Sequence, residues 1–330
     1  MKLPKCQDRL IEEVLKVQPN VVVVLHNGSP VELPWADRVS AILEMYLGGQ
    51  GVGEACDRLL FGEANPSGRL SETFPYRLED NPSFLHFPGN GKRVLYGEDI
   101  FVGYRYYDTK KVPVRYAFGH GLSYTEFTYG DLTLSSAQMT DEDILTVSLK
   151  VKNSGKTEGK EVVQLYVADL CGISERPVKE LKGFAKVHLL PGEEKTVSME
   201  ISARNLSYYE ERLGDWYAPS GTYRILIGHA SDDIRLHADV VFETKKKLPL
   251  RVDFTTTFGE LLDHTKTAPV ITELLAPLAA AAASAEGMSD EYKKLGEQVI
   301  REMPLKSLLG QMPGEQVEQL IGQLNCLLAQ

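Results

Sequence analysis

The sequence is poor in cysteine, in basic clusters and in long apolar runs, and each scarcity excludes a class of protein. Its four cysteines are scattered without any CxxC spacing, which argues against a zinc site and fits a reducing compartment. The net charge of −10 argues against nucleic acid or an anionic membrane surface as the partner. No run approaches about 18 apolar residues, and no apolar signal segment follows Met1. We therefore expect a soluble, cytoplasmic protein.

Motifs for metals and cofactors are missing as well. The seven histidines show neither HxxxH nor HExxH spacing, so the sequence predicts no metal site. The glycine-rich segment 48–53 lies between an expected strand and an expected helix, but its spacing is not GxGxxG. No complete strand follows it with an acidic residue at its end to hold a ribose. We expect no nucleotide cofactor, and we interpret these glycines as allowing a sharp turn and close packing.

The first 125 residues contain helical and strand-like segments in alternation, which is typical of βα units. Residues 7–18 place apolar side chains on roughly one face, and Pro19 ends this expected helix. The run 21–25 is apolar throughout, as in a central parallel strand covered on both faces, and residues 41–47 form a second buried strand. A helix follows at 53–60, and Gly62 is placed to close it in the left-handed conformation.

We therefore expect that the chain begins in the middle of an α/β domain, because nothing before residue 21 can supply the neighbouring strands. Two strands without the first half of their domain leave edges and apolar faces open. Such surfaces predict self-association or aggregation.

From about residue 130 to residue 243 the hydrophobic pattern changes to period two. Residues 145–152 and 196–201 alternate apolar and polar side chains, and turn signals stand at 153–155, 191–192 and 219–221. Regular short strands over this length predict a β-sandwich. The absence of a Cys…Trp…Cys pattern favours the fibronectin type III kind over the immunoglobulin kind.

After the lysines at 245–247 the pattern becomes helical. An alanine-rich helix begins near Thr267, a second opens at 289–291, and a third runs over 314–328. The fold class is thus α/β plus all-β: a partial α/β/α sandwich domain, then a fibronectin type III-like β-sandwich, then a small helical tail. We place these three parts at 1–128, 129–246 and 247–330.

The densest aromatic and charged stretch, residues 96–108, is one candidate for a functional site. Its adjacent carboxylates Glu98 and Asp99 would point to opposite sides of an extended chain, so they cannot form a facing acid/base pair by themselves. We favour a structural connector in which the tyrosines pack and Arg105 pairs with an acid. The alternative is that Glu98, Asp99 and Arg105 face a substrate.

Several long motifs occur in a fixed order along the chain. In the first part they are NVVVVLHNGSPVELPW (20–35), YLGGQGVGEACDRLLFGEANPSGRLSETFP (46–75), YGEDIFVGYRYYD (96–108) and AFGHGLSYTEF (117–127), and in the sandwich they are LKGF (181–184), LPGE (190–193) and the segment 221–228. Together they resemble glycoside hydrolase family 3, the β-glucosidase-like enzymes. The resemblance covers about residues 1 to 245, and the helical tail is similar to extensions on some bacterial members.

The resemblance implies a retaining enzyme with a barrel domain, a six-stranded α/β sandwich and often a fibronectin-like domain. Its active site would lie between the first two domains. The nucleophilic Asp would come from the barrel, and the acid/base Glu would lie shortly before a Leu-Pro-x-x-Gln element, which here is residues 3–7. Both carboxylates then fall outside this sequence, so we assign no catalytic residue and do not promote Glu32, Glu54 or Glu98. We expect a C-terminal portion that is inactive alone, acting on a β-glucoside or oligosaccharide only when a barrel completes it.

Two other interpretations stay open. The chain can be a non-catalytic module that binds carbohydrate or assembles with a separate barrel chain, or an unstable by-product with no role of its own. For the first, the aromatics Tyr208, Tyr209, Trp216 and Tyr217 can stack on sugar rings. We prefer to place them as core and corner residues of the sandwich. Trp216 also belongs to a Gly-Asp-Trp motif that resembles the nucleophile motif of some glycosidases, but there too we favour a packing role beside a turn.

Overall fold

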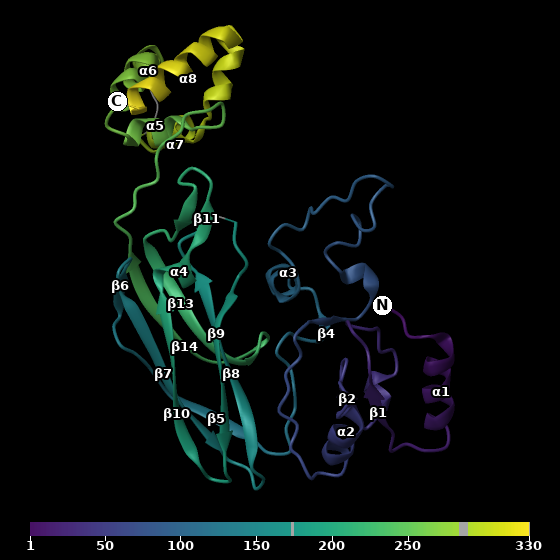
Figure 1. Ribbon diagram of the computed structural model, residues 1–330. Coiled ribbons are helices and arrows are strands. Elements are labelled where there is room, and N and C mark those ends of the chain that lie inside the picture. Colours follow the sequence, from purple (N-terminus) through teal and green to yellow (C-terminus); the bar gives the residue numbers. More distant parts are fainter. Residues whose placement is uncertain (173–174, 284–289, 330) are drawn as a thin grey trace. The chain divides into compact units, whose positions relative to one another are not determined.

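The computed structural model describes residues 1–172, 175–283 and 290–329, shown in Figure 1. Contacts within the chain define two compact units, of which the first comprises Met1–Tyr209 with Trp216–Lys246. The second comprises Glu210–Asp215 with Lys247–Gln330. Position 289, where one helix was expected to open, lies outside the described residues.

The first unit begins with an α/β part of short elements. In order these are α1 (Lys5–Leu15), β1 (Val22–Leu25), the 3-10 turn η1 (Ala36–Arg38), β2 (Ala41–Glu44), α2 (Val52–Leu60), β3 (Phe74–Pro75), the 3-10 turn η2 (Leu78–Asp80), α3 (Tyr104–Lys110) and β4 (Val114–Tyr116). Strands β1 and β2 pair in parallel, with Val22 opposite Ala41, as the βα pattern predicted. Strands β3 and β4 pair antiparallel.

The core of this part gathers around Trp35, which is fully buried and donates its indole N–H to Asp8 of α1 over 2.9 Å. Strand β1, in contrast, is not covered on both faces as its apolar sequence predicted. Val22 is exposed over 51% of its surface, because within the described residues β1 pairs with β2 alone. The apolar run at residues 21–25 is typical of a strand in the middle of a larger sheet than the two-stranded one that contains β1.

The predicted helix and strand bounds need two corrections. Helix α1 ends at Leu15 and not near residue 18, because Pro19 disfavours helical geometry in the residue before it and residues 16–18 form a turn. Strand β2 ends at Glu44 and not at residue 47, because Tyr46 has a φ of 48°, in the left-handed region. Helix α2 ends as expected before Gly62, which has a φ of 78°.

The β-sandwich follows, with two larger sheets, a separate two-stranded pair and a few short connecting elements. Its elements are β5 (Phe127–Leu134), β6 (Gln138–Thr140), β7 (Ile144–Asn153), β8 (Gly159–Asp169), β9 (Glu180–Leu189), β10 (Glu194–Ser202), α4 (Ala203–Leu206), β11 (Tyr208–Glu210), β12 (Asp215–Tyr217), β13 (Gly221–Ala230) and β14 (Asp233–Glu243). One sheet has the order β10-β7-β5 and the other the order β6-β14-β13-β8-β9. Neighbouring strands run antiparallel except β6 and β14, which are parallel.

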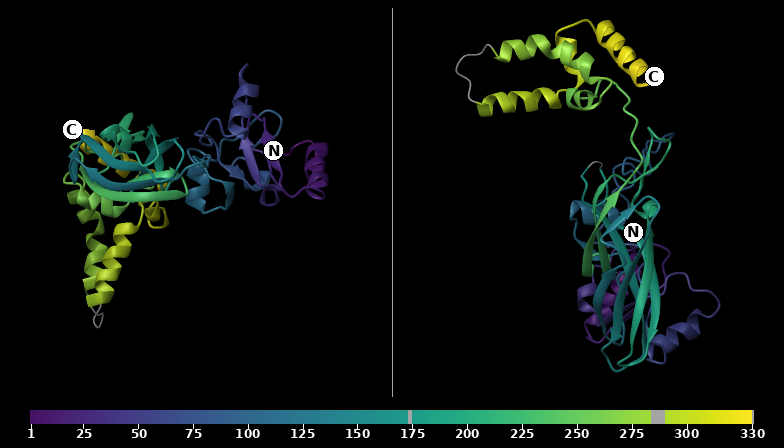
Figure 2. Two further views of the ribbon diagram at one scale, coloured as in Figure 1. Left: turned by 90° about the horizontal axis from the view of Figure 1, so that it is seen from below. Right: turned by 90° about the vertical axis from the view of Figure 1, so that its left-hand side faces the viewer.

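The predicted alternation in the sandwich is confirmed. Along β7 the side chains of Leu145, Val147, Leu149 and Val151 are all buried, while Lys150 and Lys152 between and beyond them are exposed. They pack with inward-facing residues of the second sheet, such as Ile225, into one core. Figures 1 and 2 show this sandwich beside the α/β part of the same unit.

The second unit is helical, as the pattern after residue 247 predicted. It contains α5 (Phe258–Asp263), α6 (Ala268–Ala283), α7 (Asp290–Glu302), the 3-10 turn η3 (Leu305–Gly310) and α8 (Gly314–Ala329). Its core includes Leu261, Ile271, Leu305, Val317 and Leu324. Within the described part of the chain no helix is both long and apolar enough to cross a membrane.

Candidate functional site

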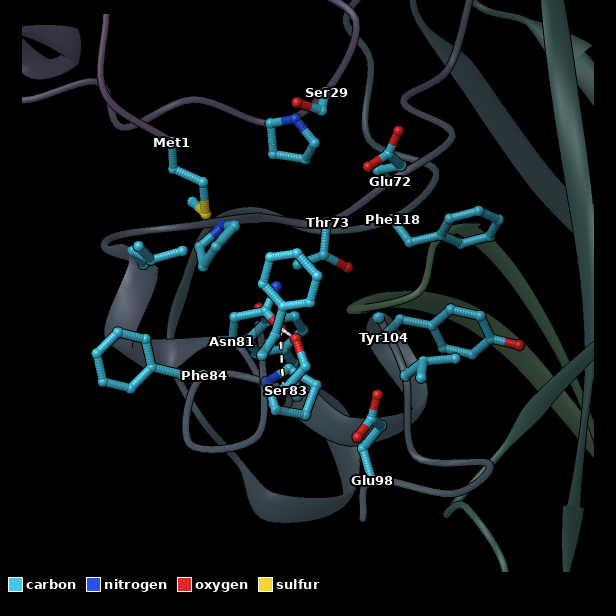
Figure 3. Close-up of a pocket in the computed structure, with 18 of the residues that line it drawn as sticks. Met1, Ser29, Glu72, Thr73, Asn81, Ser83, Phe84, Glu98, Tyr104 and Phe118 are labelled. Atoms are coloured by element: carbon cyan, nitrogen blue, oxygen red, sulfur yellow. Dashed lines mark hydrogen bonds between the residues drawn. The ribbon is translucent and has the colours of Figure 1, made fainter. Parts of the chain in front are cut away.

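A cavity of about 760 Å³ lies in the α/β part of the first unit (Figure 3). This volume falls within the range of about 300–1,000 Å³ that is typical of small-molecule sites. Its lining comes from five stretches that are distant in sequence: Met1, the turn after β1 at residues 29–30, residues 71–88, residues 98–107, and Phe118. The fold, and no single motif, therefore creates it.

The cavity wall is mostly apolar, and hydrogen bonds hold one of the segments that form it. Its larger apolar side chains are those of Leu78, Phe84, Phe87, Val102, Tyr104, Tyr107 and Phe118. The segment after η2 is held by Asn81, whose side-chain oxygen accepts hydrogen bonds from the Ser83 amide at 3.0 Å and the Ser83 hydroxyl at 2.7 Å. Helix α3 begins directly after Gly103, where a φ of 56° lets the chain turn.

Tyr104 of α3 anchors this wall to the rest of the unit, and Tyr107 is a second buried tyrosine of the same helix. The Tyr104 ring stacks on Phe118 with centroids 4.9 Å apart, and its hydroxyl accepts a hydrogen bond from the Leu181 amide at 2.7 Å. Burial raises the pKa of Tyr107 to about 12, and burial also raises the pKa of Tyr104. Both hydroxyls are therefore protonated at neutral pH, which excludes them as general bases.

Two polar atoms of the lining are buried and have no hydrogen-bond partner among the described residues: Oε2 of Glu98 and Oγ1 of Thr73. Thr73 as a whole is exposed over only 6% of its surface. In Figure 3 the Glu98 carboxylate points into the cavity from the side opposite Glu72, and the Thr73 hydroxyl points into the space between them. An unpaired buried polar atom is costly, so both are unusual in a purely structural wall.

The structure brings one of the candidate residues from the aromatic stretch into this cavity. Glu98 lines it, whereas Asp99 does not. The extended conformation assumed for these two residues is wrong, because they lie in a turn and Asp99 has a φ of 50°. Arg105 lies on α3 and forms an ion pair with Glu180 of β9 at 3.2 Å, which matches the structural interpretation of that residue.

The aromatic residues of the sandwich lie elsewhere in the first unit. Trp216 on β12 is exposed over 38% of its surface, and the guanidinium carbon of Arg204 lies 3.1 Å from its ring centroid. Tyr209 meets Trp216 edge-on at 5.7 Å and is itself exposed over 53% of its surface. Tyr217, in contrast, is buried and packs edge-on against Tyr208. A core role thus fits Tyr217 better than it fits Tyr209.

Sequence reasoning missed a buried ionic cluster where the α/β part meets the sandwich. Glu161 of β8 is fully buried, and its carboxylate accepts hydrogen bonds from Arg69 at 2.9 Å and Tyr129 at 3.0 Å and contacts His229 Nδ1 at 2.9 Å. Burial alone would raise the pKa of Glu161, but the hydrogen bond with His229 and the Arg69 charge hold it below its usual value. A signal was present, because Glu161 shares the inward face of its strand with Val163.

Among the described residues, no group of three or more His, Cys, Asp or Glu side chains could hold a metal ion. The four cysteines are free thiols, and burial raises the pKa of the Cys171 thiol to about 11. Cys171 is therefore protonated at neutral pH and is not an activated nucleophile.

Comparison with known proteins finds matches for both the α/β part and the sandwich. Residues 1–124 match the glycosyl hydrolase family 3 C-terminal domain, and residues 161–231 match a fibronectin type III-like domain. The chain is 46% identical, over 98% of its length, to thermostable beta-glucosidase B of Acetivibrio thermocellus, of which it covers 43%. It is 47% identical, over 71% of its length, to a beta-glucosidase of Kluyveromyces marxianus, of which it covers 28%. The chain thus spans less than half the length of these relatives.

Solved structures agree with this comparison. The Kluyveromyces marxianus beta-glucosidase in complex with glucose superposes with a TM-score of 0.70 at 44% identity, covering 74% of this chain and 29% of that one. A beta-glucosidase of Bifidobacterium adolescentis gives a TM-score of 0.75 at 38% identity, covering 82% of this chain and 40% of that one. The partial α/β domain and the fibronectin-like sandwich expected from the sequence are both confirmed.

Proposed function

We propose that this chain, whose residues 1–124 match the glycosyl hydrolase family 3 C-terminal domain, forms the C-terminal portion of a β-glucosidase-like retaining enzyme of that family. The observation that carries the proposal is the 46% identity over 98% of the chain to a beta-glucosidase more than twice as long. Completed by a barrel domain, it would act on the O-glycosidic bond of a β-glucoside or oligosaccharide.

The chain alone does not hydrolyse glycosides under this proposal. Retention by double displacement needs a nucleophile and an acid/base carboxyl about 5–5.5 Å apart. The family resemblance puts the nucleophile in the barrel and the acid/base Glu before the Leu3–Gln7 element, so both lie outside this sequence. Of the two carboxylates that line the cavity, Glu72 is exposed and Glu98 faces it from the opposite side, an arrangement that does not replace the missing pair.

A chimera tests the proposal directly. This chain would replace the matching region of the Acetivibrio thermocellus beta-glucosidase B, with the rest of that protein kept. We expect the chimera to release nitrophenol from an aryl β-glucoside, because the relative supplies the part that this chain does not match. A chimera that folds and elutes as one species, yet shows no turnover, would contradict the proposal.

The alternative is a non-catalytic module that completes a separate barrel chain or binds carbohydrate. Two observations favour it: the open strand β1, with Val22 half-exposed, and the exposed aromatic pair Tyr209 and Trp216. Sugar-induced quenching of tryptophan fluorescence that disappears in Trp216→Ala would support it. The free cysteines are compatible with a cytoplasmic location, which we propose for either function.

A further inference from the structure

We propose that the cavity beside α3 binds a glycoside. Glu98 would accept a hydrogen bond from one of its hydroxyls, Thr73 would exchange a hydrogen bond with another, and the aromatic wall would pack against its apolar ring face. The kind of ligand rests on the proposed function, whereas the site itself rests on the cavity. Glu98 and Thr73 would then be specificity-determining residues that this chain contributes.

The first step of the argument concerns the two unpaired polar atoms. Glu98 Oε2 and Thr73 Oγ1 are buried without a hydrogen-bond partner among the described residues. An apolar occupant would leave both unsatisfied, which is unfavourable. A ligand that donates a proton to the carboxylate and exchanges a hydrogen bond with the hydroxyl is favoured. Neighbouring hydroxyls of a sugar ring can do both.

The second step concerns the shape and chemistry of the wall. The stacked rings of Tyr104 and Phe118 form one side, and Phe84 and Phe87 contribute solvent-exposed rings. A pyranose has C–H faces and an aryl aglycone has a flat ring, and either packs well against aromatic side chains. Mostly apolar walls with a few placed polar groups are the usual composition of a small-molecule site.

The third step concerns the readiness of the site. Asn81 and Ser83 hold one wall through two hydrogen bonds, and the Leu181 amide donates a hydrogen bond to the Tyr104 hydroxyl. A wall held in this way loses little conformational freedom when a ligand binds. The cavity therefore does not depend on a large rearrangement to accept its ligand.

Calorimetric titration of the full chain with p-nitrophenyl β-D-glucopyranoside tests the inference. We expect saturable binding that weakens about tenfold or more in Glu98→Gln, because a hydrogen bond to a charged acceptor is lost. Thr73→Val keeps the side-chain shape and should weaken binding about fivefold, while Thr73→Ser keeps the hydroxyl and should bind like the wild type. Glu54→Gln is the matched control, since Glu54 lies exposed at the start of α2 and does not line the cavity.

Several results would overturn the inference. One is equal affinity in the wild type, Glu98→Gln and Thr73→Val, with circular dichroism showing that all are folded. Another is the absence of saturable binding to the folded wild type. Equal affinity for p-nitrophenol alone would also contradict it, because the sugar would then contribute nothing. Turnover of the glucoside by the chain would instead refute the proposed function. The affinity of Glu98→Gln would still show whether the cavity binds the glycoside.

Discussion

Replacing Glu161 with Gln should strongly destabilise the junction between the α/β part and the sandwich. The Glu161 carboxylate is fully buried and lies 2.9 Å from the guanidinium of Arg69, which is itself exposed over only 6% of its side chain. The substitution leaves a buried cation without its counter-ion. Breaking a buried pair in this way costs about 3–5 kcal/mol. An exposed pair such as Arg224 with Asp239 is screened by solvent and contributes far less to stability, so Asp239→Asn is the matched control.

Urea unfolding measured by tryptophan fluorescence can detect this difference. In a Trp216→Phe background the signal comes from Trp35, which is fully buried in the core of the α/β part. With a denaturant slope of about 1–3 kcal/mol per molar urea, a loss of 3–5 kcal/mol lowers the midpoint by at least about 1 M. Asp239→Asn should lower it by far less. Equal shifts in the two variants would refute the reasoning.

Other predictions follow from the same contacts. Burial alone would raise the pKa of Glu161, but the hydrogen bond with His229 lowers that pKa below its usual value. The ionised carboxylate therefore stabilises the fold fully above the unfolded pKa of about 4.3, and this stabilisation is lost as pH falls through the folded pKa. The urea midpoint should drop more between pH 5 and pH 3 in the wild type than in Glu161→Gln, and parallel curves would contradict this. Gly119→Ala should destabilise by more than about 1 kcal/mol in thermal unfolding, because its φ is 83° and a Cβ would lie 2.2 Å from Gln164 Oε1. Leu165→Ala removes a fully buried core side chain and should cost about 2–5 kcal/mol, so an unchanged melting temperature would contradict the core assignment.

The sandwich was predictable because its signal is local. Residues 145–152 alternate in sequence and β7 spans Ile144–Asn153, while residues 196–201 lie within β10 (Glu194–Ser202). A half-buried antiparallel sheet forces this alternation on each strand separately. The helices of the tail were predictable for the same reason, since an apolar face repeats every turn.

The cavity was not predictable because no local pattern contains it. Its unpaired polar atoms belong to Thr73 and Glu98, and its aromatic stack pairs Tyr104 with Phe118. The sequence predicts Glu98 and Asp99 in extended chain, but the chain turns at Asp99 and becomes helical after Gly103, both with positive φ. The tertiary contacts of Tyr104 favour that conformation, and a sequence pattern does not show them.

We propose that both catalytic carboxylates lie outside this chain, and nitrophenol release from aryl β-glycosides by the purified chain tests this most directly. Its size should be recorded on the same sample. We expect no release above the enzyme-free blank, because double displacement needs both groups in place. Turnover that survives purification and scales with the amount of chain would contradict the account, and Glu98 and Asp99 would then be the first residues to substitute.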